Sequence, residues 1–106
     1  MILQPDGMIE RHEWSGAIDE DGMPAGTNGA AWMHGLLGGY LEAVEVTFEG
    51  HERMAFVDED GIRKRLPDNM PATKIVKRRY RVQSNIVGKL LIWIPSEQLP
   101  WRDIDK

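Results

Sequence analysis

Turn-forming residues interrupt the apolar runs of this 106-residue chain at short intervals, and this spacing limits the fold to short strands and helices. The sequence Pro5-Asp6-Gly7 separates the run Met1–Gln4 from the run Met8–Trp14. Proline followed by Asp-Gly is a strong turn signal, so we expect an opening hairpin. Ser15–Gly29 contains four glycines and lacks apolar periodicity, which predicts a long surface loop.

The segment after this loop carries the start and stop signals of a short helix. Ala30–Leu37 places its apolar residues on one face. Thr27 or Asn28 offers a side-chain oxygen as the N-cap. The pair Gly38-Gly39 ends the helix, because glycine takes the left-handed conformation without steric cost.

A capping residue predicts a second helix, and an alternation of apolar and charged residues predicts a strand. Asn69 is a good N-cap, and proline is tolerated in the first helical turn, so we expect a helix over residues 70 to about 80 or 81. Tyr40–Thr47 alternates apolar and charged residues, which predicts a strand. The phase of this alternation slips near Ala43, which suggests a bulge.

Two further predictions concern the sheet. The segments Arg53–Val57 and Ile62–Leu66 flank the turn sequence Asp58–Gly61, so we expect a second hairpin with its glycine in the left-handed conformation. Ile86–Ile94 is the most hydrophobic segment of the chain and is expected to form a central strand.

These elements predict an α+β fold: a small, mostly antiparallel sheet with two short helices packed on one face. The chain is long enough to bury one modest core. We therefore expect a single domain over residues 1–94, and a C-terminal tail over residues 95–106 that is either loose or docked through Trp101.

The residue types argue against catalysis and against bound metals or cofactors. The chain has no cysteine, and its three histidines lack metal-ligand spacing. No serine lies in a nucleophile elbow, and no phosphate-binding or dinucleotide-binding fingerprint is present. We expect a protein that is not an enzyme and holds no cofactor or metal. The longest apolar run is far shorter than the roughly 20 residues that span a bilayer, so we expect a cytoplasmic protein without membrane contact.

Charge is strongly segregated along the chain. Residues 1–61 contain two basic and thirteen acidic side chains, a balance of −11, whereas residues 62–89 contain nine basic side chains and one acidic, a balance of +8. In a helix over residues 70–81, Lys74, Lys77, Arg78 and Arg81 would form one basic stripe. Either the acidic segments of the chain itself neutralise this stripe, or an anionic partner does.

The basic and acidic clusters are our candidate contact surface for a partner. Its members are the basic residues Arg63, Lys64, Arg65, Lys74, Lys77, Arg78, Arg79 and Arg81, and the acidic residues Asp19, Glu20 and Asp21. We expect the partner to be a protein. Nucleic acid bound by the basic stripe is one alternative. Sequestration of a small anionic nucleotide or metabolite, in a pocket lined by arginine and by Tyr40 or Asn69, is another. A homo-oligomer is compatible with the sequence.

Between roughly residues 30 and 94 the chain contains several short motifs, whose positions are Gly38, Gly39, Tyr40, Glu42, Gly61, Leu66, Pro67, Asn69, Ala72, Thr73 and Gly88. These motifs resemble a family of small proteins from phages and mobile elements, catalogued as a domain of unknown function (thirty-eight forty-six).

The resemblance implies a phage-type accessory protein of unassigned activity that acts in the cytoplasm of a bacterial host. Most of the motif positions have structural explanations, such as a helix stop, a turn or a cap. Tyr40, Glu42, Asn69 and Thr73 are polar enough to be site residues. Together with the charged clusters, the resemblance predicts a non-catalytic protein that binds a host macromolecule.

Overall fold

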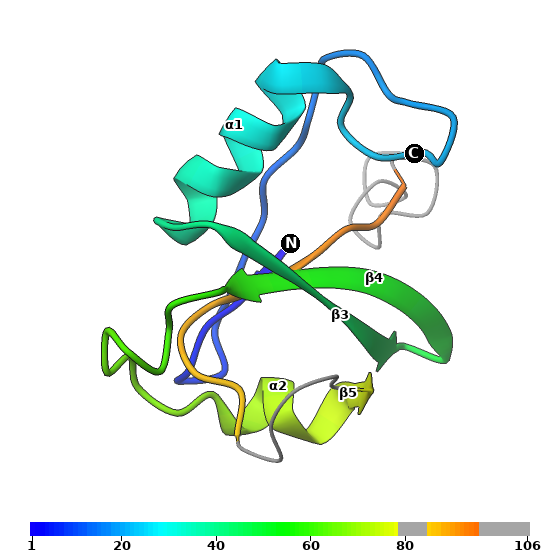
Figure 1. Ribbon diagram of the computed structural model, residues 1–106. Coiled ribbons are helices and arrows are strands. Elements are labelled where there is room, and N and C mark those ends of the chain that lie inside the picture. Colours follow the sequence, from blue (N-terminus) through cyan, green and yellow to red (C-terminus); the bar gives the residue numbers. More distant parts are fainter. Residues whose placement is uncertain (79–84, 96–106) are drawn as a thin grey trace.

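The computed structural model describes residues 1–78 and 85–95, and these form one antiparallel sheet with two helices (Figure 1). The strand order is β2-β1-β6-β4-β3-β5. The elements in chain order are β1 (Ile2–Leu3), β2 (Ile9–Glu10), α1 (Gly26–Leu37), β3 (Leu41–Phe48), β4 (His51–Asp58), α2 (Met70–Ile75), β5 (Val76–Arg78) and β6 (Leu90–Ile92). The predicted α+β class, with its antiparallel sheet, is therefore confirmed.

The sheet is apolar on both faces, and each face carries one helix. In β6, Leu91 packs on the α1 side with Met33, whereas its neighbours Leu90 and Ile92 pack on the other side with Ala72 of α2. Successive side chains of a strand point to opposite faces, so the two helices lie on opposite sides of the sheet, as Figure 1 shows. The sequence led us to expect both helices on one face. The correction follows from β6, which is apolar at every position and needs cover on both sides.

The phase slip within Tyr40–Thr47 reflects these two faces. Leu41 packs on the α1 side, whereas Val44 and Val46 belong to the buried cluster on the α2 side. All eight residues of β3 pair with β4 in continuous register, so no bulge separates these two strands. The register shift of β3 lies on its other edge, where it pairs with β5 between Glu45 and Val46.

The long hairpin is β3–β4, and its turn is Glu49-Gly50. Both residues have positive φ angles, 51° and 80°, as the two-residue turn that matches strand twist requires. The predicted hairpin around Asp58–Gly61 is wrong, because β4 is already paired with β3 and with β6. Ile62–Leu66 forms turns instead, and the left-handed residue there is Arg65, with a φ of 57°.

The helix ends follow the capping signals only in part. Gly38 ends α1 in the left-handed conformation, as expected, with a φ of 79°. The helix begins at Gly26, earlier than expected, and neither Thr27 nor Asn28 caps it. The side chain of Asn69 caps α2 by accepting the N–H of Ala72, which confirms that prediction.

The opening hairpin is confirmed, and the loop after it is held by tryptophans. β1 pairs with β2, and Gly7 in the turn has a φ of 88°. Trp93 donates a 2.7 Å hydrogen bond to the carbonyl of Gly22, and the rings of Trp14 and Trp32 contact each other with centroids 5.2 Å apart and planes tilted by 42°. Apart from Pro95, the predicted C-terminal tail, whether loose or docked through Trp101, lies outside the described residues. No helix in the described part of the chain is long and apolar enough to cross a membrane.

Candidate functional site

The basic stripe predicted for a long second helix is not formed. α2 ends at Ile75, and Val76 has extended backbone angles. Ile75 and Val76 are β-branched and pack against the α2-side cluster, which favours a strand over further helix. Lys77 and Arg78 therefore lie on β5, and a helical spacing no longer groups them with Lys74. The predicted positions Arg79 and Arg81 lie outside the described residues.

The chain's own carboxylates pair with several of the remaining basic residues. Arg63 contacts Asp60 at 3.0 Å, Lys64 contacts Asp58 at 2.7 Å, and Lys77 contacts Glu52. A fourth pair joins Lys89 to Glu10 at 3.8 Å. The three pairs other than Lys64–Asp58 are exposed, and exposed pairs contribute about 0–1 kcal/mol each. They nevertheless show that acidic and basic segments interleave in space, so the described residues form no continuous cationic ridge.

Arg65, Lys74 and the acidic segment Asp19–Asp21 are exposed, but the structure does not gather them into one surface. The Asp19 carboxylate accepts the backbone N–H groups of Asp21 and Met23. This closes a local turn of the kind that aspartate forms in surface loops. The segment thus has a structural explanation within its own loop.

Asn69 is fully buried and joins three parts of the chain. Its amide nitrogen donates to the carbonyls of Leu3 and Gly88 at 2.9 and 2.8 Å. Its amide oxygen accepts the N–H of Ala72 at 3.0 Å. Its amide nitrogen and its amide oxygen are both engaged within the protein, which is the arrangement of a structural residue.

Thr73 and Gly88 support the same junction. The Thr73 hydroxyl donates to the carbonyl of Asn69 at 2.8 Å and accepts the N–H of Ile86 at 2.9 Å. Gly88 has a φ of 72°, and a Cβ there would lie 2.7 Å from the Cδ1 atom of Leu66. These two motif positions therefore hold the segment before β6 against the start of α2.

A partly buried ion pair joins the end of β4 to the end of α1. Asp58 is 7% exposed, and its carboxylate accepts Lys64 Nζ at 2.7 Å and the N–H of Asp60 at 2.8 Å. Lys64 also donates to the carbonyl of Gly38 at 3.2 Å. Burial alone would raise the pKa of Asp58, but the hydrogen bonds from Lys64 and Asp60 outweigh it and lower the pKa below 3.8.

The glycine motif fits closely around this pair. A Cβ on Gly39 would lie 2.6 Å from both carboxylate oxygens of Asp58, so only glycine fits there without displacing the ion pair. Gly61 is similarly confined, because a Cβ at that position would lie 2.9 Å from the Cγ2 atom of Val87. Glu42 is half-buried on β3, directly opposite Val57. The motif positions Gly39 and Gly61 thus serve the fold.

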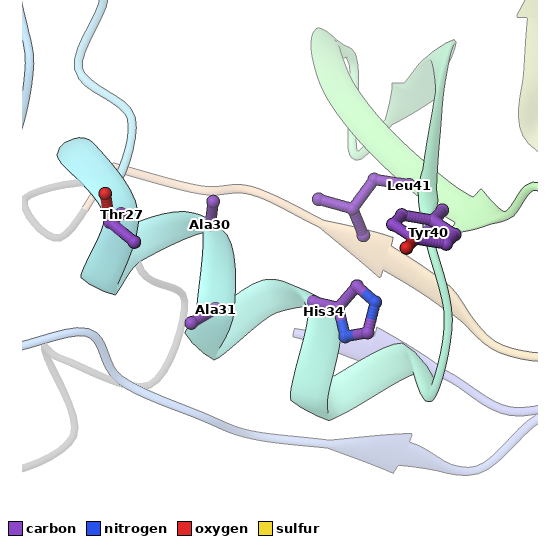
Figure 2. Close-up of a pocket in the computed structure, with 6 residues that line it drawn as sticks. All are labelled: Thr27, Ala30, Ala31, His34, Tyr40 and Leu41. Atoms are coloured by element: carbon purple, nitrogen blue, oxygen red, sulfur yellow. The ribbon is translucent and has the colours of Figure 1, made fainter.

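Tyr40 differs from the other motif residues because its side chain is 69% exposed and lines a pocket. The pocket has a volume of about 480 Å³ and lies between α1 and the start of β3 (Figure 2). Its lining residues are Thr27, Ala30, Ala31, His34, Tyr40 and Leu41. We call it the α1–β3 pocket. Its volume is within the range of sites that bind small molecules or anchoring side chains.

The local sequence explains the shape of the α1–β3 pocket. The four helical residues recur at intervals of three, one and three, so they share one flank of α1, as Figure 2 shows. Two of them, Ala30 and Ala31, are small and leave the space open. At the other end, the Tyr40 ring stands edge-on to the His34 imidazole, with centroids 5.3 Å apart and an interplanar angle of 80°.

The residues that line the pocket are mostly apolar and include few polar groups. Its polar groups are the hydroxyls of Thr27 and Tyr40 and the imidazole of His34. It contains no carboxylate or thiol that could act with His34 as a nucleophile and base. Among the described residues, no group of three or more histidine, aspartate or glutamate side chains could hold a metal ion. The pocket is therefore suited to receiving a side chain or a small apolar group.

Sequence reasoning singled out Tyr40 but missed the other five lining residues. The available signal was the composition of α1, whose twelve residues include no aspartate, glutamate, lysine or arginine. A surface helix normally shows charged residues on its outer face. The absence of charged residues from α1 was therefore the signal that its outer face forms an uncharged surface.

No protein-family model, no curated protein and no solved structure matches this chain. The resemblance to the phage family therefore stays a prediction.

Proposed function

We propose that this protein is a non-catalytic binding protein whose contact site for another protein is the α1–β3 pocket. The observation that carries the proposal is the exposed ring of Tyr40 at the mouth of an apolar pocket of about 480 Å³. Large exposed aromatic residues beside a pocket are typical of the few positions that dominate protein–protein binding energy. Elsewhere on α1, the large apolar side chains Met33, Leu36 and Leu37 are packed against the sheet.

The charged surface predicted from the sequence has less support. The basic stripe is absent, and Lys64 and Lys77 are engaged with carboxylates of the chain itself. Nucleic-acid binding and sequestration of a small anion both depended on clustered cations, and the described residues provide no such cluster. A protein partner remains, because its recognition can use an apolar pocket.

The setting of this function rests on the motif resemblance. We propose a phage-type accessory protein that acts in the cytoplasm of a bacterial host and binds a host protein. The motif positions Gly39, Asn69 and Gly88 maintain the fold, and they leave Tyr40 as the motif residue directed at a partner.

A site-specific crosslinking experiment tests the contact site. A photoreactive phenylalanine analogue replaces Tyr40 in one variant and Ile62 in the control, because Ile62 is also apolar and 56% exposed but lies outside the pocket. After irradiation in bacterial cells, we expect a discrete protein adduct from position 40 and much less from position 62.

A pair of helix variants shows whether the adduct depends on the pocket. Ala31→Phe fills the pocket, whereas Asn28→Phe adds the same ring at an exposed α1 position outside it. The adduct should disappear with Ala31→Phe and persist with Asn28→Phe. Equal crosslinking from both probe positions, or an adduct indifferent to Ala31→Phe, would contradict the proposed site.

A further inference from the structure

One edge of β3 is unpaired next to the α1–β3 pocket. Along its other edge, β3 pairs with β4 over its whole length. On the edge away from β4, β5 pairs with β3 only at Glu45 and Val46, toward the far end of the strand (Figure 1). Within the described part of the chain, no strand therefore pairs with residues 41–44 on this edge, which we call the free edge of β3. An unpaired strand edge presents backbone groups with which another extended chain can pair.

The β3–β4 turn determines which backbone groups point to the free edge. Because the turn contains two residues, the residues that flank it, Phe48 and His51, form a hydrogen-bonded pair. Hydrogen-bonded and non-hydrogen-bonded pairs alternate along an antiparallel ladder. Counting back along β3 from Phe48, Leu41 and Ala43 are non-hydrogen-bonded positions, so their N–H and C=O groups are directed away from β4.

Two observations agree with this alternation. The N–H of Glu59 donates to the carbonyl of Tyr40 at 2.8 Å, so the residue before Leu41 makes its hydrogen bond on the β4 side. Ala43 is exposed, as expected for a small residue beside an open edge. Leu41 and Ala43 thus each offer one backbone donor and one backbone acceptor to a neighbouring chain.

The pocket and the free edge lie side by side. Among the described residues, the lining of the pocket comes from α1 and from Tyr40 and Leu41, and none of it comes from β4 or β6. Figure 2 shows the Leu41 side chain directed toward α1. Residues directly opposite each other in paired strands point to the same face of the sheet. A residue paired with Leu41 would therefore direct its own side chain into the pocket.

We infer that the partner contributes an extended segment that pairs with the free edge of β3 and inserts one apolar side chain into the pocket. This inference rests on the proposed function and specifies the form of the partner. The outward donors and acceptors of Leu41 and Ala43 are complementary to those of an extended backbone, whereas a helix bonds its backbone groups internally. In strand addition of this kind, the main-chain hydrogen bonds give affinity and the pocket gives specificity.

A second copy of this chain fits the free edge less well than a short segment does. The free edge is four residues long, about 13 Å at the rise of a strand. The β3 strand of a second copy spans eight residues and carries β5 on the same edge. Pairing the two long strands would therefore bring them against β5, which already occupies the edge at Glu45 and Val46.

Amide hydrogen exchange in the free full-length protein, followed by NMR for each residue, tests whether the edge is open. We expect the N–H groups of Glu42 and Val44 to exchange at least about tenfold more slowly than those of Leu41 and Ala43, because only the former bond to β4. Equal protection at low protein concentration would show that the chain itself, for example residues 79–84, occupies the edge. Protection that grows with protein concentration would show that a second copy does. Either result would overturn the inference.

Peptide probes test the pairing itself. They are selected from a displayed library of random peptides with the full-length protein as bait, after removal of peptides that bind the Ala31→Phe variant. Methylation of single backbone nitrogens in a selected peptide then removes one donor at a time. We expect binding to weaken about fivefold or more at alternate positions and less than about twofold at the positions between them, because only alternate N–H groups of a strand face its neighbour.

A substitution in β3 removes a donor from the other side of the same contact. Ala43→Pro eliminates the N–H that points to the free edge, a position where a strand tolerates proline. Ala43→Ser is the matched control, because it changes the side chain and keeps the N–H. Binding of the selected peptides should weaken about fivefold or more in Ala43→Pro and less than about twofold in Ala43→Ser. Thermal unfolding shows whether Ala43→Pro is folded, and if it is not, the methylation pattern decides.

The outcomes separate the two proposals. If the selection yields no peptide that depends on the pocket, the proposed function fails together with the inference. If pocket-dependent peptides bind but methylation shows no alternation, the contact site stands and strand pairing is wrong. Equal binding to folded Ala43→Pro and Ala43→Ser would likewise contradict strand pairing and leave the contact site in place.

Discussion

Asp58 and Lys64 form a 2.7 Å ion pair that connects the last residue of β4 to the carbonyl of Gly38 at the end of α1. The carboxylate is buried, and the ammonium group is partly exposed. This contact fixes the position of α1 relative to the sheet. It thereby also fixes the spacing between α1 and β3 on which the pocket depends.

Removing the Asp58 charge should destabilise the protein. We expect Asp58→Asn to lower the free energy of unfolding by about 2 kcal/mol at pH 7, because hydrogen bonds to charged groups are worth about 1.5–3 kcal/mol. Chemical denaturation at pH 7 measures this. Arg63→Met is the matched control: Arg63 pairs with Asp60 on the surface and is 76% exposed, so its loss should cost under about 0.5 kcal/mol.

The contribution of the Asp58 carboxylate to the free energy of unfolding should be larger at neutral pH than in strong acid. The folded-state pKa of Asp58 lies below 3.8, so the folded protein holds fewer protons on this group than the unfolded chain. The stability it provides is present above the unfolded-state pKa and is lost as the pH falls through the folded-state pKa. The difference in stability between wild type and Asp58→Asn should therefore shrink in strong acid. A difference that persisted there would contradict the ion-pair explanation.

Two glycine-to-alanine substitutions should have opposite signs. Gly39→Ala places a Cβ 2.6 Å from the Asp58 carboxylate and should destabilise by about 1–3 kcal/mol, as overpacking does. Gly35→Ala, in the last turn of α1, has no neighbouring atom within 4 Å of the added Cβ and should stabilise by about 0.5 kcal/mol. Thermal and chemical denaturation measure both. Similar effects at both positions would show that the close contact at Gly39 is not decisive.

Asn69→Ala should be among the most destabilising single substitutions in this chain. It removes the α2 cap and leaves the carbonyls of Leu3 and Gly88 without their amide donor. We expect a loss of about 3–4 kcal/mol, the sum of a lost cap and of buried acceptors left unpaired. Asn28→Ala, at an exposed position on α1, should change stability by less than about 0.5 kcal/mol. A mild effect at Asn69 would mean that water replaces its amide.

Local signals in the sequence predicted local structure correctly. The opening turn at Gly7, the helix end at Gly38 and the cap at Asn69 each depend on residues a few positions apart. Their conformations follow from the backbone freedom of glycine and from the hydrogen-bonding capacity of a short amide. The central position of the strand predicted over Ile86–Ile94 was also predictable, because a strand that is apolar at every residue must be covered on both faces. Its length was not, since β6 covers only Leu90–Ile92.

Long-range features were not predictable in the same way. The β-branched residues Ile75 and Val76 disfavour a longer helix only weakly, and the change to β5 depends on pairing with Glu45 and Val46 some thirty residues earlier. The pocket depends on how α1 crosses β3, which no local pattern encodes. Tyr40 could be singled out as a polar motif residue, whereas Ala30 and Ala31 become site residues only through the space they leave open.

The β3–β4 turn offers a stabilising substitution. Glu49 has a φ of 51°, which is strained for a side chain of this type, and it precedes Gly50 with a φ of 80°. Asparagine tolerates the left-handed conformation better, and Asn-Gly is the preferred pair for this turn. Glu49→Asn should therefore stabilise by about 0.5–1 kcal/mol, whereas Gly50→Ala should destabilise by about 1 kcal/mol. Denaturation midpoints that moved in the same direction would contradict the assigned turn.

The buried amine of Met1 should make stability rise with pH near neutrality. Met1 is 6% exposed, and its amine donates to the carbonyl of Ile92 at 3.2 Å. Burial lowers the pKa of this amine from 8.0 to about 6. The folded protein therefore holds fewer protons on this group than the unfolded chain between pH 6 and 8, so the free energy of unfolding should increase across that interval and level off above pH 8.

The size of this increase is up to about 2 kcal/mol, because each unit of pKa difference corresponds to about 1.4 kcal/mol. Denaturant titrations at pH 6, 7 and 8 measure it. An N-terminally acetylated protein is the control, since its amide does not titrate and the increase should be correspondingly smaller. If the acetylated and free proteins gained stability equally between pH 6 and 8, other groups would be responsible. The Met1 amine would then have to reach solvent in the folded state, in conflict with its burial beside Ile92.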